Sequence, residues 1–190
     1  MRHLLLALSL IATPALAQTP PPANNAEMAK LFAEDQAIRE NLKPGWFEDM
    51  TFVRKMWADD AARRTRTRVL LDTGKLVTAD DYYAAAFVFQ HGEKPEDFLL
   101  AHTLALASAA RGRKEASWIA AATLDRYLQN IGQKQIYGTQ WRSQENQPLT
   151  REPYDRRLVP DSLRTALGVP VLARQDAQLV EMQAELAPAK

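Results

Sequence analysis

The stretch PEDFLLAHTLALASAAR, residues 95–111, decides the fold of this chain. Apolar and small side chains are spread nearly all round a helix drawn through it, the large ones being Phe98, Leu99, Leu100, Leu104 and Leu106. Pro95 suits the first turn of a helix, and the acids Glu96 and Asp97 suit the positive end of the helix dipole. Because a helix that is apolar on all sides is buried, this one is predicted to form the centre of a helical bundle.

Three glycines mark the ends of this helix and of its two neighbours. Gly92, Gly112 and Gly132 are each twenty residues apart. A glycine just past a helix end supplies the left-handed conformation of the C-cap. Thr78, with Asp81 three residues later, forms a capping box that begins the first of the three helices. This punctuation is typical of a helical array.

Apolar residues recur at helical spacing along most of the remaining chain. The pattern predicts further helices over residues 26–42, 48–71, 115–131, 160–167 and 171–186. Polar residues dominate the stretch after Ile131 and predict one long loop, and no run reads as a strand. We therefore predict an all-α fold, a compact bundle or array of about five to seven helices with one long polar loop.

The N-terminus has the features of an export signal. Arg2 and His3 precede the apolar run 4–11, and Ala-Leu-Ala at residues 15–17 fits the cleavage site of a secretory signal peptide. The apolar run is far shorter than the roughly 20 residues of a membrane-spanning helix. We expect a periplasmic or secreted protein with no stable membrane anchor after cleavage. Its expected parts are a signal peptide over 1–17, a Pro-rich leader over 18–25 and a single helical domain over 26–190.

Composition disfavours several classes of function. Only Arg2 of the 24 Lys and Arg residues lies in the signal, so the mature chain carries 23 basic and 23 acidic residues and no net charge. A basic surface for nucleic acid is therefore not expected. The absence of Cys excludes disulfides, thiolate zinc sites and a cysteine nucleophile. His91 and His102 are the only histidines after the signal, and no metal-ligand or nucleotide-binding spacing is present, so we predict no metal and no cofactor.

Two of the predicted helices place charged residues inside their apolar faces. Asp35 and Arg39 lie one turn apart on the first, and Asp60 and Arg64 repeat the pattern on the second. Burying a carboxylate is costly unless it is paired, so these residues are either ion pairs within each helix or parts of an internal polar site. His91, at a predicted helix end, is either a capping residue or a general acid or base.

The chain also carries four short motifs and a fifth that follows them. The four are Asp35-Gln36-x-x-Arg39, Gln90-His91, Asp125-Arg126-x-Leu128 and Gln135-x-Tyr137-Gly138-Thr139-Gln140, and the fifth is Arg164-x-x-Leu167-Gly168. In this combination, and above all in the motif that ends at Gln140, the chain resembles a widespread family of bacterial proteins of unknown function. The likeness covers most of residues 30–170, and it implies a set of site residues but no reaction.

The resemblance and the inward charges together select the candidate site residues. Three carry candidate catalytic groups: His91, Asp125 and Asp35. Six are candidate ligand-binding residues: Arg39, Arg126, Gln135, Tyr137, Thr139 and Gln140. In the motif that ends at Gln140, hydroxyl and amide groups suit a polar ligand, but loops also use such residues to bond themselves.

Two functions are consistent with these residues. In the first, one pocket binds a small polar ligand or carries out acid/base chemistry, including hydrolysis, with Asp125 or Asp35 as the carboxylate and His91 as the proton carrier. In the second, a repeat-like helical scaffold, similar to tetratricopeptide hairpins, binds a protein or peptide partner. A single concave pocket that contains both the inward charges and the motif that ends at Gln140 would favour the first function.

The placement of the carboxylates also predicts which of them stabilise the fold. Asp35 lies within an apolar stripe, so Asp35→Asn should leave Arg39 unpaired and destabilise the protein. Asp125 lies beside a stripe, so Asp125→Asn, like Gln140→Ala, is expected to leave the fold nearly as stable as the wild type.

We predict that signal peptidase cleaves the chain after Ala17, because the charged start, the apolar run and the small residues at 15 and 17 occur in the required order. Mass spectrometry of the exported protein should show a chain that begins at Gln18. Retention of residues 1–17 in the exported form would contradict the prediction.

Overall fold

The computed structural model describes residues 21–43, 45–143 and 147–186, and their regular structure is entirely helical. Its helices are α1 (Ala26–Glu40), η1 (Trp46–Glu48, a 3-10 turn), α2 (Met50–Asp72), α3 (Ala79–Phe89), α4 (Pro95–Ala110), α5 (Ala116–Asn130), α6 (Asp161–Ala166) and α7 (Leu172–Leu186). Within these ranges there is no β-strand, only two isolated bridges. The predicted all-α fold is confirmed. The predicted signal peptide and the first residues of the predicted leader lie outside the described ranges.

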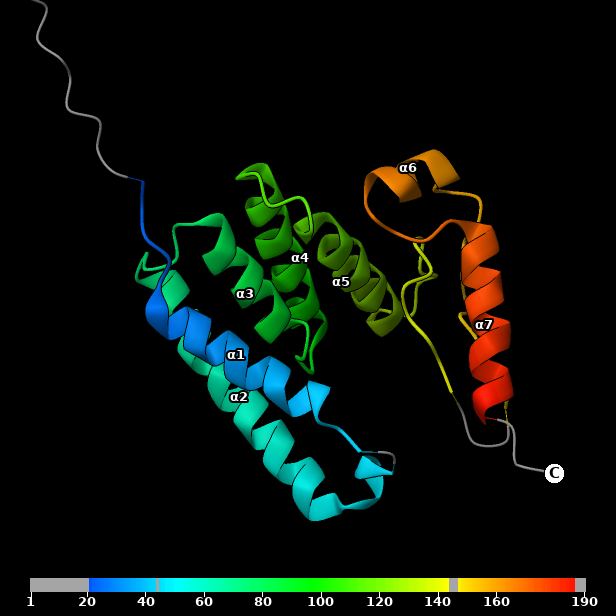
Figure 1. Ribbon diagram of the computed structural model, residues 1–190, viewed down its shortest axis with the longest axis horizontal. Coiled ribbons are helices and arrows are strands. Elements are labelled where there is room, and N and C mark those ends of the chain that lie inside the picture. Colours follow the sequence, from blue (N-terminus) through cyan, green and yellow to red (C-terminus); the bar gives the residue numbers. More distant parts are fainter. Residues whose placement is uncertain (1–20, 44, 144–146, 187–190) are drawn as a thin grey trace, which may run out of the picture.

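The helices α3, α4 and α5 lie side by side, and the hairpin of α1 and α2 packs at the α3 edge (Figure 1). The segment between α5 and α6 then separates this bundle from α6 and α7 (Figure 1). Two side chains of α7 fasten it to that segment: Gln175 Nε2 donates to the carbonyl of Tyr137 and Gln183 Nε2 to that of Leu149, both at 2.7 Å. None of the described helices has the length and apolar character needed to cross a bilayer.

Helix starts follow the predicted signals, and helix ends follow them in part. Thr78 and Asp81 form the capping box of α3, and Pro95 occupies the first turn of α4. Gly112 and Gly132 have positive φ, of 99° and 74°, as expected after α4 and α5. Gly92 does not have a positive φ; a glycine is needed there because Asp97 approaches its backbone closely. A Cβ at this position would collide with Asp97, whose carboxylate accepts hydrogen bonds from the amides that precede α4.

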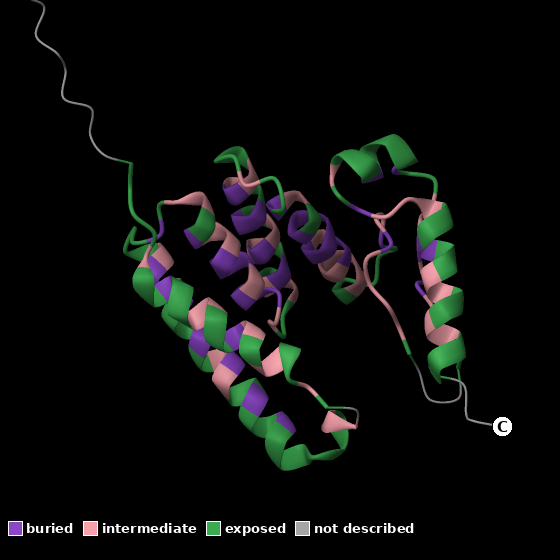
Figure 2. Cartoon of the chain, viewed as in Figure 1, coloured by how far each residue is buried: buried purple, intermediate pink, exposed green. Residues whose placement is uncertain are grey.

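Buried residues concentrate on α3, α4 and α5 (Figure 2), and Met28 of α1 and Leu70 of α2 extend this core, which is rich in alanine. Ala85, Ala101 and Ala105 are fully buried, and small side chains let the helix backbones approach closely. As predicted, α4 lies at the centre of the helix packing, between α3 and α5, but it is not buried on every side, because Leu99 and Leu106 are 41% and 51% exposed. Among the described helices, α4 packs mainly against α3 and α5, and its outer face remains open to solvent.

Candidate functional site

The predicted site residues fall into two polar groups. We call the first the charge cluster; it consists of Asp35, Arg39, Asp60, Arg63 and His91. We call the second the motif segment, residues 135–140, which is bonded to Asp125 on α5. Arg126, also on α5, lies between the two groups.

The charge cluster joins α1 to α2 through paired charges. Arg39 lies 3.1 Å from Asp35 Oδ1 and 2.8 Å from Asp60 Oδ2, and Arg63 lies 2.5 Å from Asp60 Oδ1. The predicted pair of Asp35 with Arg39 is therefore present. Both carboxylates are buried, and two guanidinium groups balance their charges, which meets the condition for burying an ion pair.

The predicted pairing of Asp60 with Arg64 is wrong. Asp60 is bound instead by Arg39, from another helix, and by Arg63. Arg64 turns toward the end of α3, where its Nη1 donates to the carbonyl of His91 at 2.7 Å. Carbonyls at a helix C-terminus lack partners within the helix and carry the negative end of its dipole, so they compete well for an arginine.

His91 is held between Asp35 and Arg39. Its Nδ1 lies 3.1 Å from Asp35 Oδ1, and its Nε2 lies 2.9 Å from Nε of Arg39. Because arginine only donates, Nε2 must accept, and the proton of the neutral ring is on Nδ1 facing Asp35. Burial lowers the pKa of His91, partly offset by the hydrogen bond from its ring to Asp35. Both ring nitrogens are occupied, so this geometry does not favour the predicted role as proton carrier.

Asp125 anchors the motif segment to α5. The fully buried carboxylate accepts hydrogen bonds from the amides of Ile136, Tyr137 and Thr139 and from the Thr139 hydroxyl, at 2.8–2.9 Å. Four donors leave the two oxygens little capacity for a substrate or a transferred proton. This arrangement favours a structural role for Asp125 over the predicted catalytic one.

Three further residues predicted to bind a ligand instead bond the motif segment to itself and to its surroundings. Gln135 Oε1 accepts from the amide of Gln140, and its Nε2 donates to the carbonyls of Gln140 and Arg151. The side chain of Gln140 bonds to Arg126, Thr139 and the carbonyl of Ala122. The carbonyl of Tyr137 accepts from Arg164 and from Gln175. The simplest interpretation is that the motif segment connects α5 to the C-terminal helices.

Gly138 makes the joint with α7 possible. Its φ is 76°, and a Cβ there would lie 2.6 Å from the Tyr154 hydroxyl and closer still to Oε1 of Gln175. The Tyr154 hydroxyl also donates to Gln175 Oε1 at 2.9 Å. Sequence reasoning missed Tyr154 and Gln175. One signal was present, because Gln175 interrupts the apolar stripe of α7 formed by Leu172 and Leu179.

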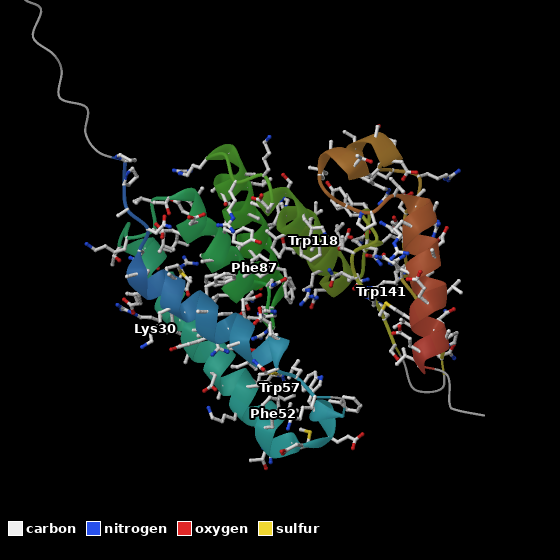
Figure 3. The ribbon with its side chains drawn as sticks, viewed as in Figure 1. Lys30, Phe52, Trp57, Phe87, Trp118 and Trp141 are labelled. Carbon is white, nitrogen blue, oxygen red and sulfur yellow. The ribbon has the colours of Figure 1, made fainter. Side chains whose placement is uncertain are left out.

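A pocket of about 390 Å³ opens between α1, α2, η1 and the end of α3, and we call it the tryptophan–arginine pocket. It is lined by Arg39, Leu42, Trp46, Met56, Trp57, Asp60, Arg64, His91, Gly92, Glu93 and Arg126. Figure 3 labels Trp57, which α2 carries beside η1. Of the predicted site residues only Arg39, His91 and Arg126 line this pocket. The inward charges and the motif segment therefore do not share one pocket.

Among the arginines that line this pocket, Arg126 is the one without a carboxylate partner in the described chain. Its Nε donates to Gln140 Oε1 at 3.1 Å and its Nη1 to the carbonyl of Gln90 at 3.0 Å. In the described part of the chain it forms no ion pair. Burial, and secondly the charge of Arg39, lower the pKa of Arg126. An anion placed beside it would relieve both effects.

Comparison with protein-family models, with curated proteins and with solved structures finds no match to this chain, so the resemblance to a bacterial family stays a prediction. Within the described ranges, no three His, Asp or Glu side chains gather closely enough to hold a metal ion.

We predict that Asp125→Asn destabilises the protein by about 3 kcal/mol, which reverses the expectation from the sequence. An asparagine supplies one acceptor oxygen in place of two and turns an NH2 group toward buried N–H donors. Denaturant unfolding will measure the loss. The control is Asp72→Asn, since that exposed carboxylate bonds only Arg68 and its loss should cost less than about 0.5 kcal/mol. Equal midpoints for the two variants would contradict the anchoring role of Asp125.

We also predict that stability falls as the pH drops below about 6.5, the ordinary pKa of histidine. Because the folded state has a lowered His91 pKa, the unfolded chain binds more protons in this range. Full stability is therefore present above the unfolded pKa and is lost as the pH falls toward the folded pKa, by up to about 1.4 kcal/mol per pH unit.

Urea unfolding between pH 5.5 and 7.5 will measure this dependence. The His91→Gln variant should lose most of it, because glutamine does not titrate, while His102→Gln should keep it. A His91→Gln variant with the wild-type slope would show that another group is responsible.

Proposed function

We propose that this is an exported binding protein whose tryptophan–arginine pocket takes a small anion with a flat apolar part. The observation that carries the proposal is Arg126, a partly buried cation that lines the pocket without a carboxylate partner in the described chain. Burying an unpaired charge is costly, and such residues are typical of sites that bind the opposite charge.

The other charged residues of the pocket leave this cation uncompensated. Asp60 already binds Arg39 and Arg63 through its two oxygens. Glu93 is 68% exposed at its side chain and reaches only Arg64, at 3.3 Å. Three guanidinium groups and two carboxylates line the pocket, so its lining has an excess of one positive charge. A ligand with one carboxylate or a similar anion would neutralise it.

The apolar side of the pocket suggests the rest of the ligand. Trp46 and Trp57 line it, and Trp57 remains 53% exposed. Tryptophan offers a large flat surface for stacking, and ligand sites commonly combine such surfaces with a few polar groups. A benzoate-like molecule, with a planar ring and one carboxylate, has the matching chemistry.

The geometry supports binding more than catalysis. A general base needs a free acceptor within reach of the substrate. His91 Nε2 accepts from Arg39, and both oxygens of Asp60 are bound by arginines. No other histidine lines the pocket. The acid/base function considered from the sequence therefore has less support than ligand binding.

The alternative function, a helical scaffold for a protein or peptide partner, keeps one observation in its favour. Leu99 and Leu106 lie two turns apart on the exposed face of α4. Against it, the described chain provides only two successive helix hairpins before α5, α1–α2 and α3–α4, fewer than the three or more repeats such arrays need.

We predict that benzoate binds the mature protein and that benzamide, its neutral counterpart, binds at least about tenfold more weakly, because only the anion neutralises Arg126. Titration can be followed through the indole N–H signals of Trp46 and Trp57 in NMR spectra, assigned with Trp→Phe variants. Arg126→Gln should remove the preference for benzoate. Arg68→Gln, which changes an exposed arginine paired with Asp72, should retain it.

Arg126 also donates a hydrogen bond to the carbonyl of Gln90, so Arg126→Gln can affect folding. Circular dichroism will show whether the variant is folded. If this variant does not fold, the proposal is tested by two measurements on the wild type alone: its preference for benzoate over benzamide and the shifts of the two indole signals. Equal binding of benzoate and benzamide would overturn the proposal.

A further inference from the structure

A second hollow, separate from the tryptophan–arginine pocket, lies between α5, the motif segment and α7. It has a volume of about 390 Å³, and it shares no lining residue with the first pocket. Trp118 of α5, Trp141 of the following segment and Met182 of α7 supply its apolar surface. The two tryptophans are labelled in Figure 3. We call this the α5–α7 hollow.

Arg151 lines the α5–α7 hollow and forms no ion pair with a carboxylate among the described residues. It is 5% exposed, lines the hollow, and its guanidinium stacks 3.7 Å over the ring of Trp141. Its terminal nitrogens donate to the carbonyl of Gln175 and to Gln178 Oε1, both neutral acceptors. Its Nε is buried and has no hydrogen-bond partner among the described residues. A buried cation in this state favours an anionic group in the adjoining space.

The rim of the hollow carries both charges, because Arg174 lines it beside two glutamates. Glu181 and Glu185 of α7 line it and are exposed. Glu181 pairs with Arg174 at 3.0 Å, whereas Glu185 pairs with no cation in the described chain. Both glutamates lie in the last two turns of α7, where the helix dipole also favours a positive charge. The hollow therefore offers a buried cation, Arg151, and one rim carboxylate, Glu185, that no described cation neutralises.

The spacing along α7 sets the length of a ligand that meets both charges. Arg151 is bound to Gln178, and Glu185 follows seven residues later. At about 1.5 Å per helical residue, this is a separation of roughly 10 Å along the helix. An extended peptide spans at most about 3.3–3.6 Å per residue, so two or three residues cover the distance once the side chains reach inward.

From these observations we infer that the α5–α7 hollow binds a free peptide of two or three residues with an apolar C-terminal side chain. The peptide carboxylate meets Arg151, the ammonium group lies near Glu185, and the apolar side chain packs against Trp118 and Met182. The volume of the hollow lies within the range of roughly 300–1,000 Å³ that is usual for small-ligand sites. This inference does not rest on the function proposed for the other pocket.

The test compares the dipeptide Ala-Phe with two blocked forms, by calorimetric or NMR titration of the mature protein. Amidation of the carboxylate should weaken binding at least about tenfold, because it leaves buried Arg151 unpaired. Acetylation of the amine should weaken it only about threefold, because Glu185 is at an exposed rim. Free phenylalanine should bind more weakly than Ala-Phe, since it is too short to reach both charges.

Variants at exposed positions keep the test independent of folding. Glu185→Gln should erase the difference between Ala-Phe and its acetylated form, and Trp118→Ala should weaken both. Glu34→Gln, on the distant helix α1, is the matched control and should change neither. Equal binding of free and amidated dipeptide, absence of saturable binding, or an unchanged effect of acetylation in Glu185→Gln would each overturn the inference.

Discussion

The carboxylate of Asp125 is the interaction on which the C-terminal third of the molecule depends. It projects from the buried face of α5 and collects four donors from the motif segment. The carbonyl of Tyr137 then points outward and accepts hydrogen bonds from Arg164 and Gln175. One buried charge thus substitutes for the helix-to-helix packing that joins the other elements. The free-energy cost of burying this carboxylate is offset, because each N–H or O–H group that it binds is a polar group that would otherwise need another partner.

The same segment lies between the two pockets. On one side, Gln140 accepts a hydrogen bond from Arg126, which lines the tryptophan–arginine pocket. On the other side, Thr139 lines the α5–α7 hollow, and Nε2 of Gln140 donates to its hydroxyl at 3.1 Å. Along this path, the side chain of Gln140 alone connects a lining residue of one pocket to a lining residue of the other. The motif therefore matters for both sites, although most of its side chains point toward protein atoms.

The helices could be predicted from the sequence because each is determined by residues close together in the chain. Thr78 and Asp81, or Asp35 and Arg39, are neighbours on one helix, so their spacing predicts their contact. Partners on different elements have no such signal. Asp60 binds Arg39, twenty-one residues away, instead of Arg64 on its own helix. Composition alone also cannot tell whether a polar loop binds a ligand or itself, since Gln135 and Gln140 use the same amide groups for either purpose.

The attachment of α7 through hydrogen bonds has a kinetic consequence. The strongest helix packing ends at α5, so the C-terminal helices can detach while the contacts of α3, α4 and α5 persist. The amide hydrogens of Ile136, Tyr137 and Thr139 are bonded to a side-chain carboxylate, and this partial opening frees them. They will exchange with solvent at the rate of that local opening, whereas the interior amides of α4 and α5 wait for global unfolding. We therefore expect hydrogen exchange to separate the described helices into two cooperative units, with the boundary at Asp125.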